Sequence, residues 1–172
     1  MASSSKPRSP SSARAGCALA VAVLVMGAQV PSAVFGEPED YLVVISPDVP
    51  MSNLSLDQVR RIFLFREKYW KAGLQATIII SDEGLEPGSL LLKKIYRMDH
   101  TALRRLILEK LYQGEIDLAP KVVASDRVAV DFVAAGHGLI TLVRASVVQG
   151  KSVKILSVDG LSVGAAGYAL RR

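Results

Sequence analysis

The sequence is poor in the side chains that build metal sites, disulfides and catalytic centres. It contains one cysteine, Cys17, and two histidines, His100 and His137. Neither histidine has a second candidate ligand at the helical or hairpin spacing of a metal site. Nucleophile elbows, phosphate-binding loops and dinucleotide fingerprints are absent from the sequence. We therefore predict no catalytic residue, no metal and no cofactor, and we expect the protein not to be an enzyme.

Acidic residues are missing from the start of the chain, where the first one is Glu37. An apolar run covers residues 17–30, and three cations precede it: Lys6, Arg8 and Arg14. A basic start, an apolar stretch of about 7–15 residues and a small residue at the cut define a secretory signal. The sequence therefore predicts a signal peptide over residues 1–36, cleaved after Gly36.

Two other interpretations of this segment stay open. Cleavage after Ala33 or Ala28 is an alternative to cleavage after Gly36. A retained anchor is another, because about 20 apolar residues can cross a bilayer as a helix. Four residues interrupt the run early and favour cleavage: Gly27, Gln29, Pro31 and Ser32. Lipidation of Cys17 is excluded, since this residue stands at the start of the apolar run rather than after it, and Arg14 stands where a lipobox carries leucine.

Most of the net charge of +5 belongs to the same segment. Cleavage after Gly36 lowers the number of basic residues from 21 to 18, against 16 acidic ones. Nucleic-acid binding requires a concentrated basic patch, so we expect no nucleic-acid partner. Cleavage also removes Cys17 and leaves no disulfide partner, which suits an oxidising compartment. We predict a periplasmic or secreted protein.

The remaining chain alternates between strand and helix patterns. Continuous apolar runs predict strands buried on both faces, at residues 41–45, 75–80, 122–124, 138–143 and 153–156. Apolar residues at helical spacing predict helices, over residues 56–65, 89–97, 99–113 and 125–135. In the third of these helices the stripe expected to be buried comprises Leu103, Leu106, Ile107 and Leu111. This order predicts an α/β fold, a single three-layer lobe with a mostly parallel sheet of about five strands flanked by helices.

Several short segments occur in the order and spacing of a known family. They are residues 53–63 after a strand, Trp70 with Gly73, residues 111–114, residues 120–126, and residues 158–160 with 168–170. In these segments the chain resembles the phosphate-type substrate-binding proteins of ABC transporters, which have the type 2 periplasmic-binding-protein fold. The resemblance implies one periplasmic-binding-protein-like domain over residues 37–172. It also implies a small anion such as phosphate as ligand, and a membrane transporter or envelope protein as partner.

The sequence departs from the family pattern in its motifs and in its length. Residues 63–66 read Phe-Leu-Phe-Arg where the family carries Phe-Leu-Gly-Lys, and residues 87–89 read Pro-Gly-Ser where Ser-Gly-Thr holds phosphate. The family clamps its ligand between two lobes, and this chain matches one of them. The alternative function is therefore a non-catalytic interaction or assembly module in the periplasm that kept the fold and lost the clamp.

The strongest ligand-binding candidates are Gly88 and Ser89, at the turn before a predicted helix. A helix N-terminus offers unpaired amides and about half a positive charge, which suits an anion. In the simpler interpretation Ser89 is an ordinary N-cap in an ordinary turn. Ser46 and Ser125 also follow strands, and ligands of open α/β sheets gather beyond the carboxyl ends of strands. Both also fit structural roles, Ser46 in a turn and Ser125 as a helix cap.

Charged side chains cluster near that turn. Residues 81–88 are predicted to be a solvated loop that carries three acids: Asp82, Glu83 and Glu86. A calcium loop is the alternative, but their spacing lacks the regular ligands of an EF-hand. The next two helices carry five cations: Lys93, Lys94, Arg97, Arg104 and Arg105. These are expected to be solvated, with an acidic partner or a lipid head group as the alternative.

Overall fold

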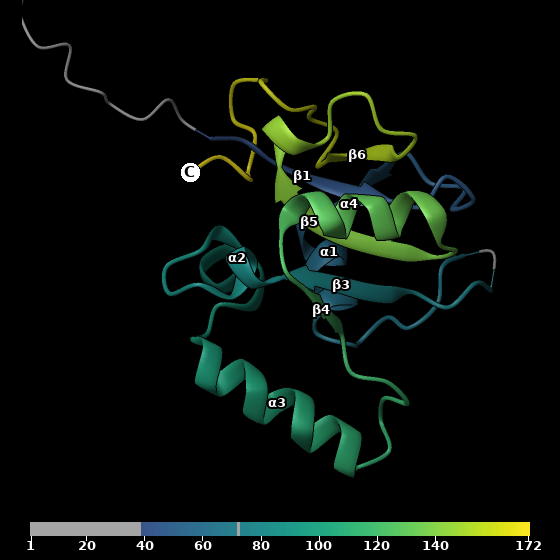
Figure 1. Ribbon diagram of the computed structural model, residues 1–172, viewed down its shortest axis with the longest axis vertical. Coiled ribbons are helices and arrows are strands. Elements are labelled where there is room, and N and C mark those ends of the chain that lie inside the picture. Colours follow the sequence, from purple (N-terminus) through teal and green to yellow (C-terminus); the bar gives the residue numbers. More distant parts are fainter. Residues whose placement is uncertain (1–38, 72) are drawn as a thin grey trace, which may run out of the picture. The chain divides into compact units, whose positions relative to one another are not determined.

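Six strands form one sheet in the order β2-β6-β1-β5-β3-β4 (Figure 1). The computed structural model describes residues 39–71 and 73–172, so the predicted signal segment lies outside the described residues. The elements along the chain are β1 (Tyr41–Ile45), β2 (Asn53–Leu54), α1 (Leu56–Phe63), β3 (Thr77–Ser81), α2 (Asp82–Leu85), the π-helix η1 (Leu91–Tyr96), α3 (His100–Tyr112), β4 (Lys121–Val123), α4 (Asp126–Ala135), β5 (Leu139–Arg144), the 3-10 helix η2 (Ala145–Val147) and β6 (Lys154–Val158). In the described ranges no helix is both long and apolar enough to span a membrane.

The sheet is mostly parallel, with one reversed strand near its centre. β3 pairs in parallel with β4 and β5, and β2 pairs in parallel with β6. β1 lies between β5 and β6 and is antiparallel to both. The carboxyl ends of β3, β4, β5 and β6 therefore meet at one edge of the sheet, whereas β1 ends at the opposite edge.

The three-layer architecture follows from strands that are apolar on both faces. Successive strand side chains point to opposite faces of a sheet. In β1, Val43 and Ile45 face a core shared with α1 and η1, while Leu42 and Val44 face a core shared with α4. Each of these four side chains is at most 3% exposed, which confirms the prediction of a sheet covered on both sides.

Local capping signals fix where the helices begin. Ser55 Oγ accepts from the backbone N of Gln58, whose side chain accepts from Ser55 N, so the predicted capping box is present. The segment 81–88, expected to be a loop, instead begins with helix α2. Its N-cap is Ser81, whose Oγ accepts from Gly84 N at 3.1 Å. That prediction was wrong because the acidic residues here form a first helical turn, where negative charge is favourable.

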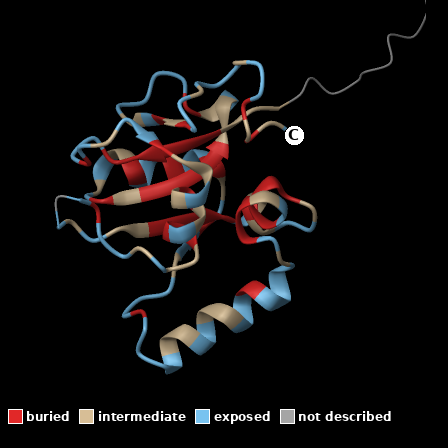
Figure 2. Ribbon diagram, turned by 180° about the vertical axis from the view of Figure 1, so that it is seen from behind, coloured by how far each residue is buried: buried red, intermediate tan, exposed pale blue. Residues whose placement is uncertain are grey.

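Helix α3 lies below the rest of the domain in Figure 1 and is poorly covered (Figure 2). Of the four residues predicted to form its buried stripe, only Leu103 is buried, at 1% exposed. Leu106, Ile107 and Leu111 are half-buried. The helical spacing was predicted correctly, but the face that it creates has little to pack against within the described residues.

Candidate functional site

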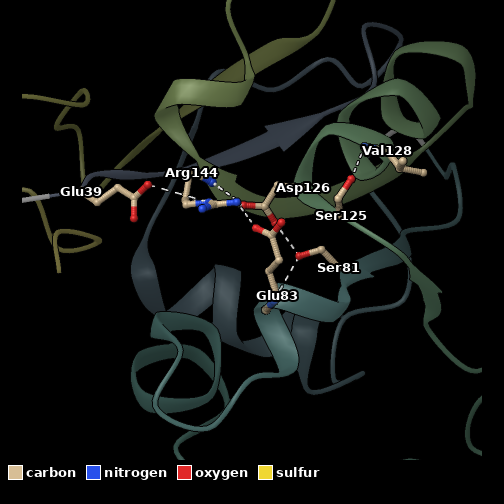
Figure 3. A network of polar contacts seen from close by, with 8 residues as sticks. Glu39, Ser81, Glu83, Ser125, Asp126, Val128 and Arg144 are labelled. Atoms are coloured by element: carbon tan, nitrogen blue, oxygen red, sulfur yellow. Dashed lines mark hydrogen bonds and ion pairs between the residues drawn. The ribbon is translucent and has the colours of Figure 1, made fainter.

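An arginine at the end of β5 and a carboxylate at the start of α4 form the centre of the polar edge of the sheet (Figure 3). Arg144 Nε lies 3.0 Å from Asp126 Oδ2, and the Arg144 backbone N donates to the same oxygen at 3.1 Å. The Asp126 side chain is 4% exposed and that of Arg144 is 32% exposed. The carboxylate of Asp126 is therefore removed from water, while the guanidinium of Arg144 is still partly in contact with solvent.

Two further side chains from the β3–α2 junction complete this cluster. Ser81 Oγ donates to Asp126 Oδ1 at 2.5 Å while it caps α2. Glu83, in the first turn of α2, pairs with Nη2 of Arg144. Glu39, which precedes β1, lies 3.8 Å from Arg144 Nε. β1, β3, β5 and two helix N-termini thus converge on one arginine (Figure 3).

The hydrogen bonds explain why a buried carboxylate is tolerated at this edge. Burying a charge is costly unless it is paired and its remaining lone pairs are satisfied. Asp126 accepts three hydrogen bonds from two residues, Ser81 and Arg144, and it also begins a helix, where the dipole favours a negative charge. The cluster therefore links three elements that the chain order keeps far apart.

A hollow of about 260 Å³ adjoins this cluster at the carboxyl edge of the sheet. Its polar walls include Glu83, Glu86, Ser89, Asp126, Arg144 and Arg172. Leu91 and Leu142 supply apolar wall. Ligands of open α/β sheets bind beyond the carboxyl ends of strands, so this hollow is the candidate binding site.

The charges around the hollow are not equally available to a ligand. Arg144 already uses Nε and Nη2 on carboxylates, whereas its Nη1 makes no hydrogen bond to a described residue. The guanidinium of Arg172 makes no ion pair with any residue in the described ranges, and Glu86 likewise has no cation partner there. The walls of the hollow therefore carry both guanidinium donors and a carboxylate that are not paired with another described residue.

A neighbouring ion pair positions Arg172 at the hollow. Arg171 Nε donates to Asp40 Oδ1 at 2.7 Å and its Nη2 to Oδ2 at 3.2 Å. Arg172 N in turn donates to the Glu39 carbonyl at 3.2 Å. The hydrogen bonds from Arg171 hold the pKa of Asp40 below its ordinary value. Glu39 and Asp40, just before β1, therefore hold the C-terminal residues Arg171 and Arg172 in place.

Of the four sequence candidates, only Ser89 lines the hollow. Ser89 is buried, and its Oγ donates to the Gly84 carbonyl at 2.6 Å and accepts from Leu92 N at 3.3 Å. The segment that follows is the π-helix η1 rather than a regular helix, and the backbone N of Leu92 in its first turn already donates to Ser89 Oγ. Gly88 has φ +84° and lies beside the Lys93 ammonium. Gly88 and Ser89 thus shape the turn before η1, and Ser89 also forms part of the wall of the hollow.

The other two serines do not line the hollow. Ser125 is the N-cap of α4, where its Oγ accepts from Val128 N at 3.4 Å (Figure 3). Ser46 follows β1 and therefore lies at the opposite edge of the sheet. It is fully buried and donates to the Val133 carbonyl at 2.9 Å while accepting from Leu139 N at 3.1 Å. The reversed direction of β1 separates Ser46 from the site.

Sequence reasoning passed over the residues that make the cluster. Neither Asp126 nor Arg144 was predicted to belong to a site, and Glu83 was expected to be a solvated acid. Among the described residues no group of histidine, cysteine, aspartate and glutamate side chains is arranged to hold a metal ion. The signal that could have identified Asp126 is an acid at the first position of a helix directly after a strand.

The fold of the described residues is similar to part of the fold of solved substrate-binding proteins. No protein-family model and no curated protein matches the chain. Among solved structures, PstS from Borrelia burgdorferi is similar, with a TM-score of 0.54 and 16% identity over 78% of this chain and 55% of that one. A Clostridium perfringens protein solved with bound phosphate, a phosphate ABC transporter substrate-binding protein, has a TM-score of 0.54 and 17% identity over 78% and 53%. The chain spans about half the length of these structures, and the likeness is one of fold.

Proposed function

We propose that this protein is an exported solute-binding domain that takes a small oxyanion, phosphate foremost, into the hollow beside Arg144. The single observation that carries the proposal is the joint presence of Arg144 Nη1 and Arg172 in one hollow at the carboxyl edge of the sheet. A guanidinium presents donors in a planar fork that matches the oxygens of phosphate. The likeness of fold to a solved substrate-binding protein with bound phosphate supports phosphate as the ligand.

The acidic wall favours an oxyanion that carries a proton. A carboxylate only accepts hydrogen bonds, so Glu86 repels a fully ionised oxyanion such as sulfate. Phosphate near neutral pH still carries an OH group, which can donate to that carboxylate while its other oxygens face the two arginines. The geometry thus supports phosphate over sulfate as the ligand. Delivery of that ligand to a membrane transporter is the cellular role that we propose.

Thermal unfolding with added oxyanions tests this proposal. A ligand at about one hundred times its Kd raises the free energy of unfolding by about 2.7 kcal/mol. For a domain of this size that corresponds to an increase in Tm of roughly 10 °C. We expect this response to phosphate and a much smaller one to sulfate at equal ionic strength. Mass spectrometry of the protein recovered from the cell envelope tests the predicted cleavage after Gly36.

Two matched variants test whether phosphate binds in the hollow. Arg172→Gln should abolish most of the phosphate response, because it removes the unpaired guanidinium from the hollow. Arg127→Gln removes an exposed arginine of α4 that does not line the hollow, and it should leave the response unchanged. A Tm that does not move with millimolar phosphate would refute phosphate binding and favour the interaction module instead.

A further inference from the structure

The hollow beside Arg144 is lined by more negative than positive side chains. Its walls carry four carboxylates and two guanidiniums, which belong to Glu39, Glu83, Glu86, Asp126, Arg144 and Arg172. The formal charge of this lining is therefore −2. A cleft lined by an excess of one sign of charge concentrates ligands of the opposite sign. A ligand that is only anionic is attracted by the two guanidiniums but repelled by the lining as a whole.

The positive charge of Arg144 is already balanced by its neighbours. Its guanidinium pairs with Asp126 and with Glu83, and Glu39 Oε1 lies 3.8 Å from its Nε. Three carboxylates thus share one cation. Nη1 of Arg144 can still donate to a ligand oxygen, but the residue adds little net positive charge to the hollow. Of the two guanidiniums in the described lining, that of Arg172 is the one that no carboxylate balances.

Glu86 is the corresponding unbalanced carboxylate. It is the C-cap residue of α2, and its side chain makes no ion pair with a described residue. Lys93 lies beside Gly88 in the same turn but forms no ion pair with Glu86. A phosphate OH offers this carboxylate one donor, whereas an ammonium group offers three donors and a positive charge. The lining therefore matches a ligand that carries a cation as well as an oxyanion.

The hollow also has more room than inorganic phosphate needs. A water molecule takes up about 30 Å³, so a space of about 260 Å³ holds roughly nine groups of that size. Phosphate has five non-hydrogen atoms, and a phosphate ester with a two-carbon ammonium tail has eight. Bonds of about 1.5 Å place that ammonium about 5 Å from the phosphorus, which fits a hollow roughly 8 Å across. Leu91 and Leu142 provide apolar wall for the carbon atoms.

We propose that the ligand of this hollow is a zwitterion, a small phosphate monoester with an ammonium group on a two-carbon tail. This inference rests on the proposed oxyanion site and names its ligand class. The phosphoryl oxygens accept from Arg172 and from Arg144 Nη1, and the ammonium donates to Glu86. Each unbalanced charge of the lining then meets the opposite charge on the ligand.

The exposure of Glu86 sets the expected strength of the preference. An ion pair at an exposed carboxylate changes a Kd by up to about fivefold. The excess of carboxylates in the lining also attracts the ammonium, at longer range. We therefore expect the ammonium group to tighten binding by about fivefold to tenfold.

Isothermal titration calorimetry on the full chain tests the proposal with two esters that differ in one group. 2-Aminoethyl phosphate ends in an ammonium group, whereas propyl phosphate has the same number of non-hydrogen atoms and ends in a methyl group. At equal pH and ionic strength, 2-aminoethyl phosphate should have a Kd about fivefold to tenfold lower than that of propyl phosphate. Inorganic phosphate is titrated alongside as the test of the oxyanion site itself.

Three variants assign the preference to one end of the ligand. Glu86→Gln should reduce it to less than about twofold, because the carboxylate that contacts the ammonium is gone. Asp82→Asn is the matched control, since Asp82 is an exposed acid of α2 that does not line the hollow, and it should leave the preference unchanged. Arg172→Gln should weaken both esters by a similar factor, because it acts on the phosphoryl end. The exposed position of Glu86 keeps its variant foldable.

The outcomes separate this proposal from the one on which it rests. Equal Kd values for the two esters, in a protein that binds phosphate, would overturn the zwitterion and leave the oxyanion site standing. A preference that survives Glu86→Gln, or that Asp82→Asn removes as well, would also contradict the proposal. If neither phosphate nor either ester binds, the oxyanion site and the zwitterion are both refuted. Binding of 2-aminoethyl phosphate without binding of inorganic phosphate would support the zwitterion and refute phosphate as the ligand.

Discussion

Replacing Arg144 by methionine separates the charge of this residue from its packing. Methionine keeps an unbranched apolar stem of similar length and removes the guanidinium that contacts Asp126 and Glu83. The backbone N of residue 144 and Ser81 Oγ still donate to Asp126 in this variant. The change therefore leaves a buried carboxylate with two donors and no cation.

The expected loss of stability follows from those contacts. Removing one partner of a fully buried ion pair costs about 3–5 kcal/mol, but the Arg144 side chain is 32% exposed and Asp126 keeps two hydrogen bonds. A hydrogen bond to a charged group contributes about 1.5–3 kcal/mol. The pair with Glu83 is nearer the surface and contributes less than about 1 kcal/mol. We therefore expect Arg144→Met to lower the free energy of unfolding by about 2–3 kcal/mol.

Urea unfolding followed by circular dichroism measures this loss, and a double-mutant cycle assigns it. In a background that carries Asp126→Asn, the Arg144→Met change should cost less than about 1 kcal/mol, because no charge is left unpaired. Arg127→Met is the control on the same helical turn and should stay within about 0.5 kcal/mol of the wild type. An equal cost in both backgrounds, or a cost below about 0.5 kcal/mol in the first, would refute the pairing argument.

Two further predictions concern the backbone and the alkaline limit of stability. Gly138→Ala should destabilise the domain by about 2–5 kcal/mol in urea unfolding, because φ is +66° and the new Cβ would lie 2.3 Å from the Gln75 carbonyl oxygen. The control Gly114→Ala shares a positive φ but has open space, so it should cost only about 1–2 kcal/mol. Burial, and to a lesser extent the charge of Asp40, raises the pKa of Tyr168 from 10.0 to about 12. Between pH 10 and 12 the unfolded chain therefore loses a proton that the folded chain keeps, and the free energy of unfolding should fall as the pH rises. In Tyr168→Phe that alkaline decline should be weaker in pH-dependent unfolding, and an unchanged decline would contradict it.

Local signals in the sequence predicted most of the fold. The apolar runs gave the strands because a strand covered on both faces needs no polar alternation. The Ser55–Gln58 pair gave the start of α1 because a capping box acts within one turn. The antiparallel direction of β1 could not be predicted from such local signals. A doubly buried strand has the same pattern whether its neighbours run parallel or antiparallel, and only the pairing of distant segments decides it.

The candidate site was harder to predict because its contacts are not local. Asp126 and Arg144 are 18 residues apart, and Glu83 and Arg144 are 61 apart. Taken singly, each residue matches a common surface pattern, an acid in a first helical turn or an arginine after a strand. Ser89 was predicted because a serine before a helix is a local pattern, whereas the partners of Arg144 can be recognised only when β3 and β5 are paired.

The role of Arg144 in stability limits its role in binding. Its Nε and Nη2 are held by Asp126 and Glu83, so they are oriented before any ligand arrives. A ligand that took these donors would leave Asp126 buried without a cation, at a cost comparable to the loss expected for Arg144→Met. Only Nη1 and Arg172 are therefore available to an anion. The pair of Arg171 with Asp40 positions Arg172, so Asp40→Asn should disturb the position of Arg172. We expect this variant to lose more free energy of phosphate binding, measured from the Kd, than free energy of unfolding.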